Sequence, residues 1–182
     1  LSKDVETDDN LMRQTSARLP WLLIGMLGGI GNSMILGNFD ATFAAHPEMA
    51  LYIPLIGGTG GNVGTQSSAI IVQGLANSSL EASETFKQIG KEAVVAAINA
   101  TIISLLVYIY NFIRFGATAT VTYSVSISIF AVVLFASIFG TLVPMTLEKL
   151  KIDPAIATGP FISITNDIIG MLLYMGITVL LS

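Results

Sequence analysis

The sequence AIATGPFISITNDIIGMLLYMGITVLL at Ala155–Leu181 is a long apolar run with one charged side chain, Asp167, near its middle. A helix needs about 20 predominantly apolar residues to cross a lipid bilayer, and this run is long enough. It lacks the strict alternation of apolar and polar residues that marks a membrane β-strand. The stretch therefore predicts a membrane-spanning helix that carries a carboxylate at mid-bilayer depth.

Four further apolar runs precede this one. The whole chain is 53% hydrophobic and 11% charged, with a mean hydropathy of +0.76, whereas soluble domains carry about 25% charged residues. Backbone groups cannot stay unpaired in lipid, so helices are the expected conformation. We therefore expect an all-α membrane protein with five transmembrane helices, at Leu19–Asn38, Leu51–Ala76, Ala93–Phe115, Thr122–Leu147 and Ala155–Leu181.

The basic residues predict the orientation of these helices. All lysines and arginines except Arg114 lie before the first run, between the second and third, or between the fourth and fifth. Cytoplasmic loops carry an excess of Lys and Arg. We therefore expect the N-terminus inside the cell and the C-terminus outside.

The composition excludes several kinds of site. Without cysteine the chain has no disulfide or thiolate metal site, and its single histidine, His46, rules out a histidine cluster. The net charge of −4 gives no indication of a nucleic-acid partner. Because the chain begins at Leu1 rather than Met, we expect that an upstream part is missing.

Asp167 is the most informative residue. A carboxylate at mid-bilayer costs about 2.5–3.5 kcal/mol on insertion scales, and no lysine or arginine lies in the interior of another run. A stripe at helical spacing, Pro160, Ser163, Asp167, Gly170 and Tyr174, suits a water-lined path. The alternative is a protonated Asp167 that is hydrogen-bonded between helices.

The second run contains the segment PLIGGTGGNVGTQ at Pro54–Gln66, with five glycines in eight residues. Glycine is a poor helix former, but within a membrane it permits close helix approach or a break beside a cavity. Thr59, Asn62, Gln66 and Gln73 share one helical face and form a second polar stripe. Helix packing alone is the alternative explanation of the glycines.

These stripes indicate a hard cation. In a two-fold dimer, the commonest closed assembly, two Asp167 carboxylates would balance one divalent ion. Oxygen ligands without thiolate or imidazole suit Mg²⁺, Ca²⁺ or Mn²⁺, and Mg²⁺ usually keeps several waters. A hydrated Mg²⁺ is our first choice, with Mn²⁺ and Ca²⁺ left open. The alternatives are a proton- or cation-coupled carrier with Asp167 as relay, and an intramembrane aspartyl protease, which would need a second carboxylate.

The residues described above resemble the MgtE-type magnesium channels. The resemblance rests on PLIGGTGGNVGTQSS, on Pro144, on the step Asp153-Pro154-Ala155, and on Gly159-Pro160 followed by TNDIIG at Thr165–Gly170. It extends over the chain from Leu19 onward. It implies a Mg²⁺ channel or transporter and not an enzyme: a multi-pass plasma-membrane homodimer whose pore lies on the two-fold axis and lets ions enter the cytoplasm down their electrochemical gradient.

The resemblance also implies roles for particular segments and residues. Residues 1–18 would end a cytosolic helix that leads from upstream Mg²⁺-sensing domains, and residues 19–182 would form the five-helix pore domain. Metal ligands are expected at Asp167, Ser163 and Gly159, and a second metal site at the cytoplasmic mouth is expected at Glu92 and Asp153. The pore-lining positions expected are Gly58, Thr59, Asn62, Gln66, Pro160, Asn166 and Gly170.

Overall fold

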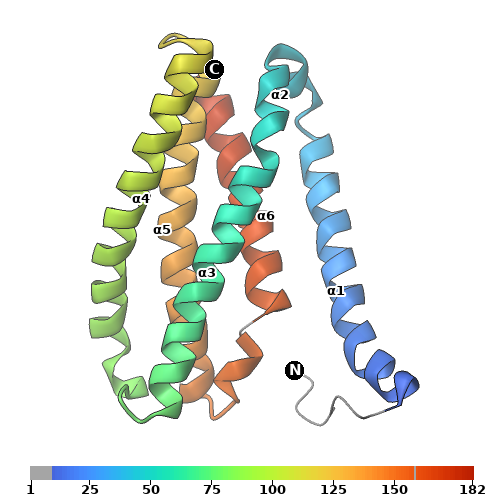
Figure 1. The fold of residues 1–182 in the computed structure, drawn as a ribbon, viewed down its shortest axis with the longest axis vertical. Helices are drawn as coiled ribbons and strands as arrows, with labels where there is room; N and C mark the ends of the chain where they lie inside the picture. The colour runs from blue at the N-terminus through green and yellow to red at the C-terminus, as the bar shows by residue number, and fades with distance from the viewer. Residues whose placement is uncertain (1–9, 158) are drawn as a thin grey trace.

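A computed structural model of the chain describes residues 10–157 and 159–182, and these residues form helices without any β-strand. This confirms the all-α prediction. The five long helices are α1 (Leu11–Gly37), α3 (Ile53–Ala76), α4 (Thr85–Phe115), α5 (Thr120–Lys149) and α6 (Pro160–Leu181) (Figure 1). Shorter elements connect them: α2 (Asp40–Ala45) and the 3₁₀ helices η1 (Pro47–Tyr52), η2 (Ala82–Glu84) and η3 (Pro154–Ala157).

The long helices cover the five predicted runs with shifted ends. α1 begins at Leu11, inside the segment expected to precede the pore domain, and α4 begins at Thr85. α6 begins only at Pro160 because Gly159 has φ +119° and ψ −140°, a backbone conformation that glycine tolerates and other residues rarely adopt. Proline then fits the first helical position, where its missing N–H leaves no hydrogen bond unmade.

By length and composition, four of the described helices are apolar enough to cross a membrane: α1, α4, α5 and α6. The helix α3 is not among them, because its glycines, amides and hydroxyls lower its hydropathy. The five-span count therefore stays a prediction, with α3 as the helix on which it depends.

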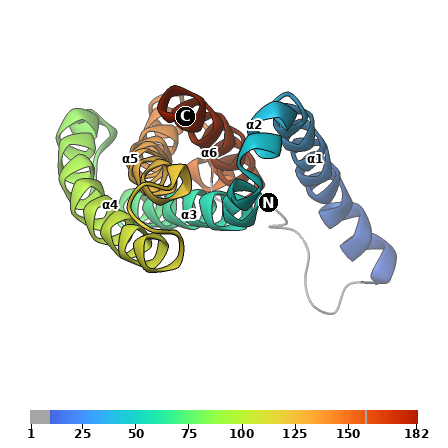
Figure 2. The same ribbon diagram turned by 90° about the horizontal axis from the view of Figure 1, so that it is seen from above.

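The central helix of the bundle is α5, on which α3, α4 and α6 all pack. Figure 2 shows α4 and α1 at opposite ends of the molecule, with α3, α5 and α6 between them. Among the long helices, α1 packs mainly on α6 and has no buried residue. Large apolar side chains of α1 and α4 are exposed, among them Leu22, Met26, Ile98 and Ile102, as expected for helices that face lipid.

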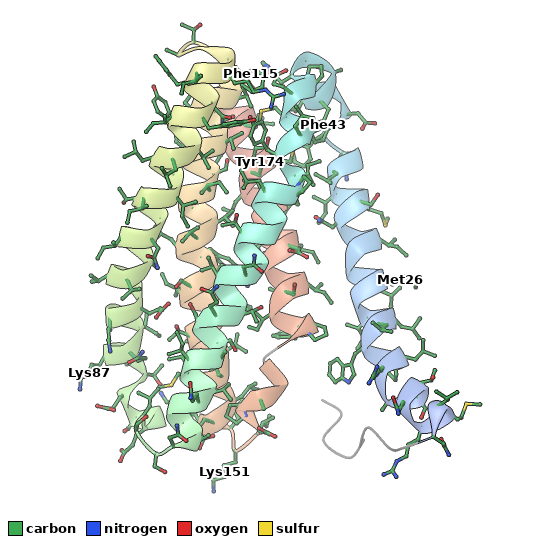
Figure 3. The ribbon with its side chains drawn as sticks, in the orientation of Figure 1. Met26, Phe43, Lys87, Phe115, Lys151 and Tyr174 are labelled. Atoms are coloured by element: carbon green, nitrogen blue, oxygen red, sulfur yellow. The ribbon has the colours of Figure 1, made fainter. Side chains whose placement is uncertain are left out.

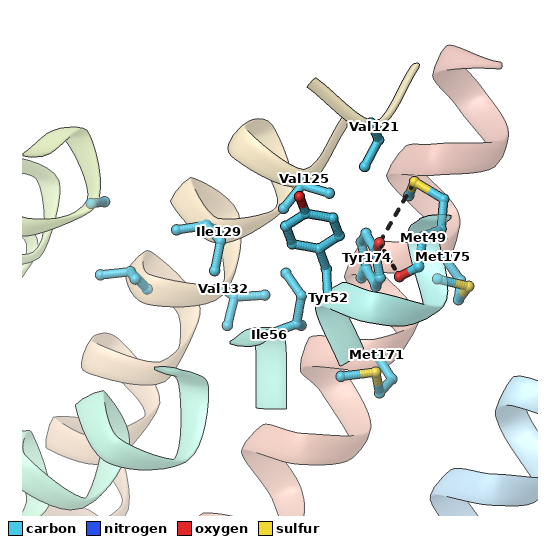
Figure 4. Close-up of a cluster of buried hydrophobic side chains, with 12 residues drawn as sticks. Met49, Tyr52, Ile56, Val121, Val125, Ile129, Val132, Met171, Tyr174 and Met175 are labelled. Carbon is cyan, nitrogen blue, oxygen red and sulfur yellow. Dashed lines mark hydrogen bonds between the residues drawn. The ribbon is translucent and has the colours of Figure 1, made fainter. Parts of the chain in front are cut away.

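An apolar core joins η1 to α3, α5 and α6 (Figure 4). Its largest fully buried side chain is Tyr174, whose hydroxyl donates a hydrogen bond of 2.7 Å to the backbone carbonyl of Met49. The core therefore packs the second half of α6 against η1, directly before the start of α3. Its labelled members are Met49, Tyr52, Ile56, Val121, Val125, Ile129, Val132, Met171, Tyr174 and Met175.

A second contact brings the backbones of α3 and α5 together. A Cβ atom added at Gly140 would lie 2.5 Å from the carbonyl oxygen of Gly64. A Cβ atom at Gly64 would collide with the side-chain nitrogen of Asn166 on α6. Small residues of this kind let helices approach closely within a membrane, so Gly64 and Gly140 set the spacing of the three helices.

Candidate cation-binding cavity

A cavity of about 510 Å³ lies between α1, α3 and α6. The helix α3 contributes most of its wall, α6 adds the only carboxylate among the described lining residues, and α1 adds a single amide. The lining residues are Asn32 from α1, Ile53, Gly57, Gly58, Gly61, Asn62, Thr65, Gln66 and Ala69 from α3, and Ser163, Asp167 and Met171 from α6.

The glycines of α3 leave room beside the carboxylate. A Cβ atom at Gly57 would lie 3.5 Å from Oδ1 of Asp167, and one at Gly61 would lie 3.6 Å from the same oxygen. The Cβ at Gly61 would also lie 3.3 Å from Oγ of Ser163. Gly57 and Gly61 are one helical turn apart, so a strip of bare backbone faces Ser163 and Asp167, which are also one turn apart.

The polar atoms around this space are mainly acceptors of the kind that hard cations bind. Asp167 supplies a carboxylate, Ser163 and Thr65 supply hydroxyls, and Asn32, Asn62 and Gln66 supply amides. Oδ1 of Asn32 is buried and has no hydrogen-bond partner in the described part of the chain. No lysine or arginine in residues 10–157 and 159–182 forms an ion pair with Asp167. The cavity therefore carries an uncompensated negative charge when Asp167 is ionised.

Five of the predicted residues meet in this cavity: Asp167, Ser163, Gly58, Asn62 and Gln66. Thr59, Gly159 and Pro160 are not among its lining residues. Gly159 caps α6, and its carbonyl accepts a hydrogen bond of 3.1 Å from the backbone N–H of Ser163.

Asn166 and Gly170, also predicted to line a pore, are buried within the chain. Gly170 lies against Ile56 and Val132. Asn166 is 1% exposed, and neither polar atom of its side chain has a hydrogen-bond partner among the described residues. The face of α6 that reaches the cavity therefore runs through Ser163, Asp167 and Met171 rather than through Gly170 and the buried Tyr174.

Some lining residues escaped the sequence analysis. Gly57, Gly61 and Thr65 lie in the predicted glycine-rich segment, which is the signal that could have found them. On a helical wheel, however, Gly57 and Gly61 point well away from the direction of Asn62, so the polar stripe through Asn62 did not include them. Asn32 had no such signal, because it comes from another helix and its distance to Asp167 depends on how α1 packs on α6.

The two acidic residues expected at the cytoplasmic mouth have partners within the chain. Glu92 accepts hydrogen bonds from the hydroxyls of Ser67 on α3, at 2.7 Å, and of Ser137 on α5. Asp153 is exposed, and its Oδ1 accepts a hydrogen bond of 3.0 Å from the backbone N–H of Ala155. The described residues contain no group of three or more acidic or histidine side chains that could hold a metal.

Glu92 therefore joins three helices, since it bonds from α4 to both α3 and α5. We predict that Glu92→Ala lowers the free energy of unfolding by about 1 kcal/mol, because both serine hydroxyls lose their acceptor. Thermal unfolding of the purified protein measures the loss. Glu84→Ala is the control, because the Glu84 side chain makes only a surface ion pair with Lys87 among the described residues. Equal stability of the two variants would contradict a structural role of Glu92.

Comparison with known proteins identifies the family of the chain. Residues 53–177 match the family model MgtE, described as a divalent cation transporter. The chain is 32% identical over 175 residues to the magnesium transporter MgtE of Bacillus subtilis, which covers 96% of this chain and 39% of that protein. It is 31% identical over 165 residues to the magnesium transporter MgtE of Thermus thermophilus, covering 91% of this chain and 36% of that protein.

The chain thus spans less than two fifths of the length of these curated relatives. The matched family segment begins with α3 and ends within α6, so it contains the Asp167 cavity except for Asn32. The chain belongs to the MgtE family of divalent cation transporters.

Proposed function

We propose that this chain forms, as a homodimer in the plasma membrane, a pore through which hydrated Mg²⁺ enters the cytoplasm down its electrochemical gradient. The observation that carries the proposal is the Asp167 carboxylate, which faces a cavity of hydroxyl and amide groups and has no cationic partner in the described chain. A polar cavity at mid-membrane is where an intramembrane carboxylate is tolerated, and such residues mark ion pathways.

The size of the cavity supports a hydrated ion. Six waters around Mg²⁺ need roughly 180 Å³ at about 30 Å³ each, and the cavity measures about 510 Å³. Mg²⁺ gives up its water reluctantly and is often held through water by one or two carboxylates. The same oxygen donors would also accept Mn²⁺ and Ca²⁺, so the preference for Mg²⁺ rests on hydration and on the relatives' names.

A homodimer would complete the site. Each chain contributes one carboxylate to this cavity, and a two-fold axis beside α3 and α6 would place a second Asp167 opposite the first. Two carboxylates balance one divalent ion. The partner would also shield the polar face of α3 from lipid, which would allow this helix to serve as the fifth span.

The basic residues support the proposed orientation. Lys87 and Lys151 lie at the same end of the bundle (Figure 3). Figure 1 shows that α1 and α4 both begin at the end of the bundle that carries Lys87 and Lys151. Arg13 and Arg18 lie in the first turns of α1, so they are at this end as well. An end that gathers basic residues is the cytoplasmic end by the positive-inside rule.

A proton- or cation-coupled carrier is the alternative function, because a lone intramembrane carboxylate can also serve as a proton relay. The deciding experiment is Mg²⁺ flux into proteoliposomes with and without a pH gradient. A pore predicts flux that follows the Mg²⁺ gradient and the membrane voltage and ignores the pH gradient. Flux that occurs only with a pH gradient would favour the carrier, and no flux under either condition would reject both functions for this chain.

A further inference from the structure

A second cavity, of about 320 Å³, lies between the end of α3 and the beginning of α4. It is distinct from the Asp167 cavity and lies near the end of the bundle that carries Lys87 (Figure 3). Its polar lining residues are Gln73, Asn77, Ser79, Gln88 and Lys91, and Ile70, Ile71, Gly74 and Leu80 complete its wall.

The turn between the two helices is held in place before any ligand binds. The carbonyl of Gly74 accepts hydrogen bonds from the backbone N–H groups of Ser79, at 3.0 Å, and of Leu80, at 3.2 Å. It also accepts one from the hydroxyl of Ser79, at 3.1 Å. Three bonds to one carbonyl tie the turn to the last part of α3, so this wall of the cavity is already formed.

The strongest hydrogen-bond donors in the cavity have no partner in the described part of the chain. The side chains of Gln73, Asn77, Gln88 and Lys91 make no hydrogen bond or ion pair with the rest of residues 10–157 and 159–182. Lys87, one turn earlier on α4, is instead paired with Glu84 at 3.1 Å. No acidic residue is found among the described side chains that line the cavity. An ammonium group and three amides without acidic neighbours select an anion rather than a metal ion.

We infer that this cavity binds the phosphate of an anionic phospholipid headgroup. A lysine binds phosphate as a point charge, and amide N–H groups complete the oxygens' hydrogen bonds. Basic residues at the cytoplasmic ends of membrane helices attract anionic lipids. The apolar side chains favour a lipid over free phosphate: Ile70 is 63% exposed on α3 and offers a surface for an acyl chain that inorganic phosphate could not use. This inference needs the chain to lie in a membrane but does not require it to conduct Mg²⁺.

The test is a titration of the purified chain in detergent with phosphatidylglycerol, read by native mass spectrometry. Lys91→Gln removes the charge, and we expect it to weaken retention of the lipid about fivefold. Lys87→Gln is the matched control, because Lys87 has the same charge on the same helix outside the cavity, and we expect it to bind as wild type does. Gln88→Leu keeps the charge of Lys91 and removes one amide from the cavity, so we expect a smaller loss of lipid binding. This variant tests the inference if Lys91→Gln does not fold.

Inorganic phosphate in millimolar excess separates the two sources of phosphate. Retention of the lipid under this competition supports a headgroup site. Displacement of the lipid would assign the cavity to free phosphate instead. Equal binding by wild type, Lys91→Gln and Gln88→Leu, or an equal loss in Lys91→Gln and Lys87→Gln, would overturn the inference.

Discussion

Replacement of Asp167 by asparagine is expected to lower Mg²⁺ flux into proteoliposomes at least tenfold. The substitution keeps the shape of the side chain but removes its charge, and no other acidic residue lines the described part of the cavity. At about 5 Å, through one water, a carboxylate and a divalent ion attract by about 7 kcal/mol at an effective dielectric constant of about 20. A tenfold loss requires only about 1.4 kcal/mol of this attraction.

The control for this prediction is Glu148→Gln, which removes an exposed carboxylate near the end of α5 and outside the cavity. Its flux should equal that of the wild type. Both variants should elute in size-exclusion chromatography as the wild type does, which separates loss of the charge from loss of the assembly. Unchanged flux and unchanged discrimination between Mg²⁺ and monovalent ions in Asp167→Asn would contradict the role proposed for this carboxylate.

The main features of the cavity could be predicted because they depend on local sequence. The apolar runs predicted the long helices, since length and hydropathy are properties of each run alone. A charge in the middle of such a run predicted a polar space around Asp167 for the same reason. Ser163 is one turn before Asp167 on the same helix, and the two side chains do line one cavity.

The choice between adjacent helical faces could not be made from sequence. Spacings of three and four residues are both compatible with a period of 3.6, so Gly170 and Met171 were equally good continuations of the stripe through Asp167. Packing decides between them: Gly170 lies on Ile56 and Val132, and Met171 reaches both the core and the cavity.

Contacts between distant segments gave no local signal either. Glu92 lies 25 residues from Ser67 and 45 residues from Ser137, and it meets both only because α4 and α3 pack on α5. The resemblance to the MgtE-type channels predicted a metal site at the mouth of the pore for Glu92. The start of α4 at Thr85 places Glu92 two turns inside the helix, where serine hydroxyls are its nearest partners.

Gly140→Ala is expected to lower the free energy of unfolding by about 1–2 kcal/mol, because overpacking against backbone costs up to about 3 kcal/mol and the better helix propensity of alanine offsets about 1 kcal/mol of this cost. The added methyl group would lie 2.5 Å from the carbonyl oxygen of Gly64. That oxygen belongs to the backbone and cannot rotate away, so α3 and α5 must separate. Unfolding by denaturant in bicelles measures this net loss.

Gly176→Ala provides the matched control, because it is also a glycine within a long helix but has no atom within 4 Å of an added Cβ. We expect it to be neutral or slightly stabilising, since only the helix propensity changes. In Gly140→Ala the displacement should reach the cavity as well, because Gly64 contacts Asn166, the neighbour of Asp167 in the chain. Mg²⁺ flux and stability should therefore both fall in Gly140→Ala, and neither should fall in Gly176→Ala. Equal stability of the two variants would mean that α3 and α5 are not in backbone contact at Gly64.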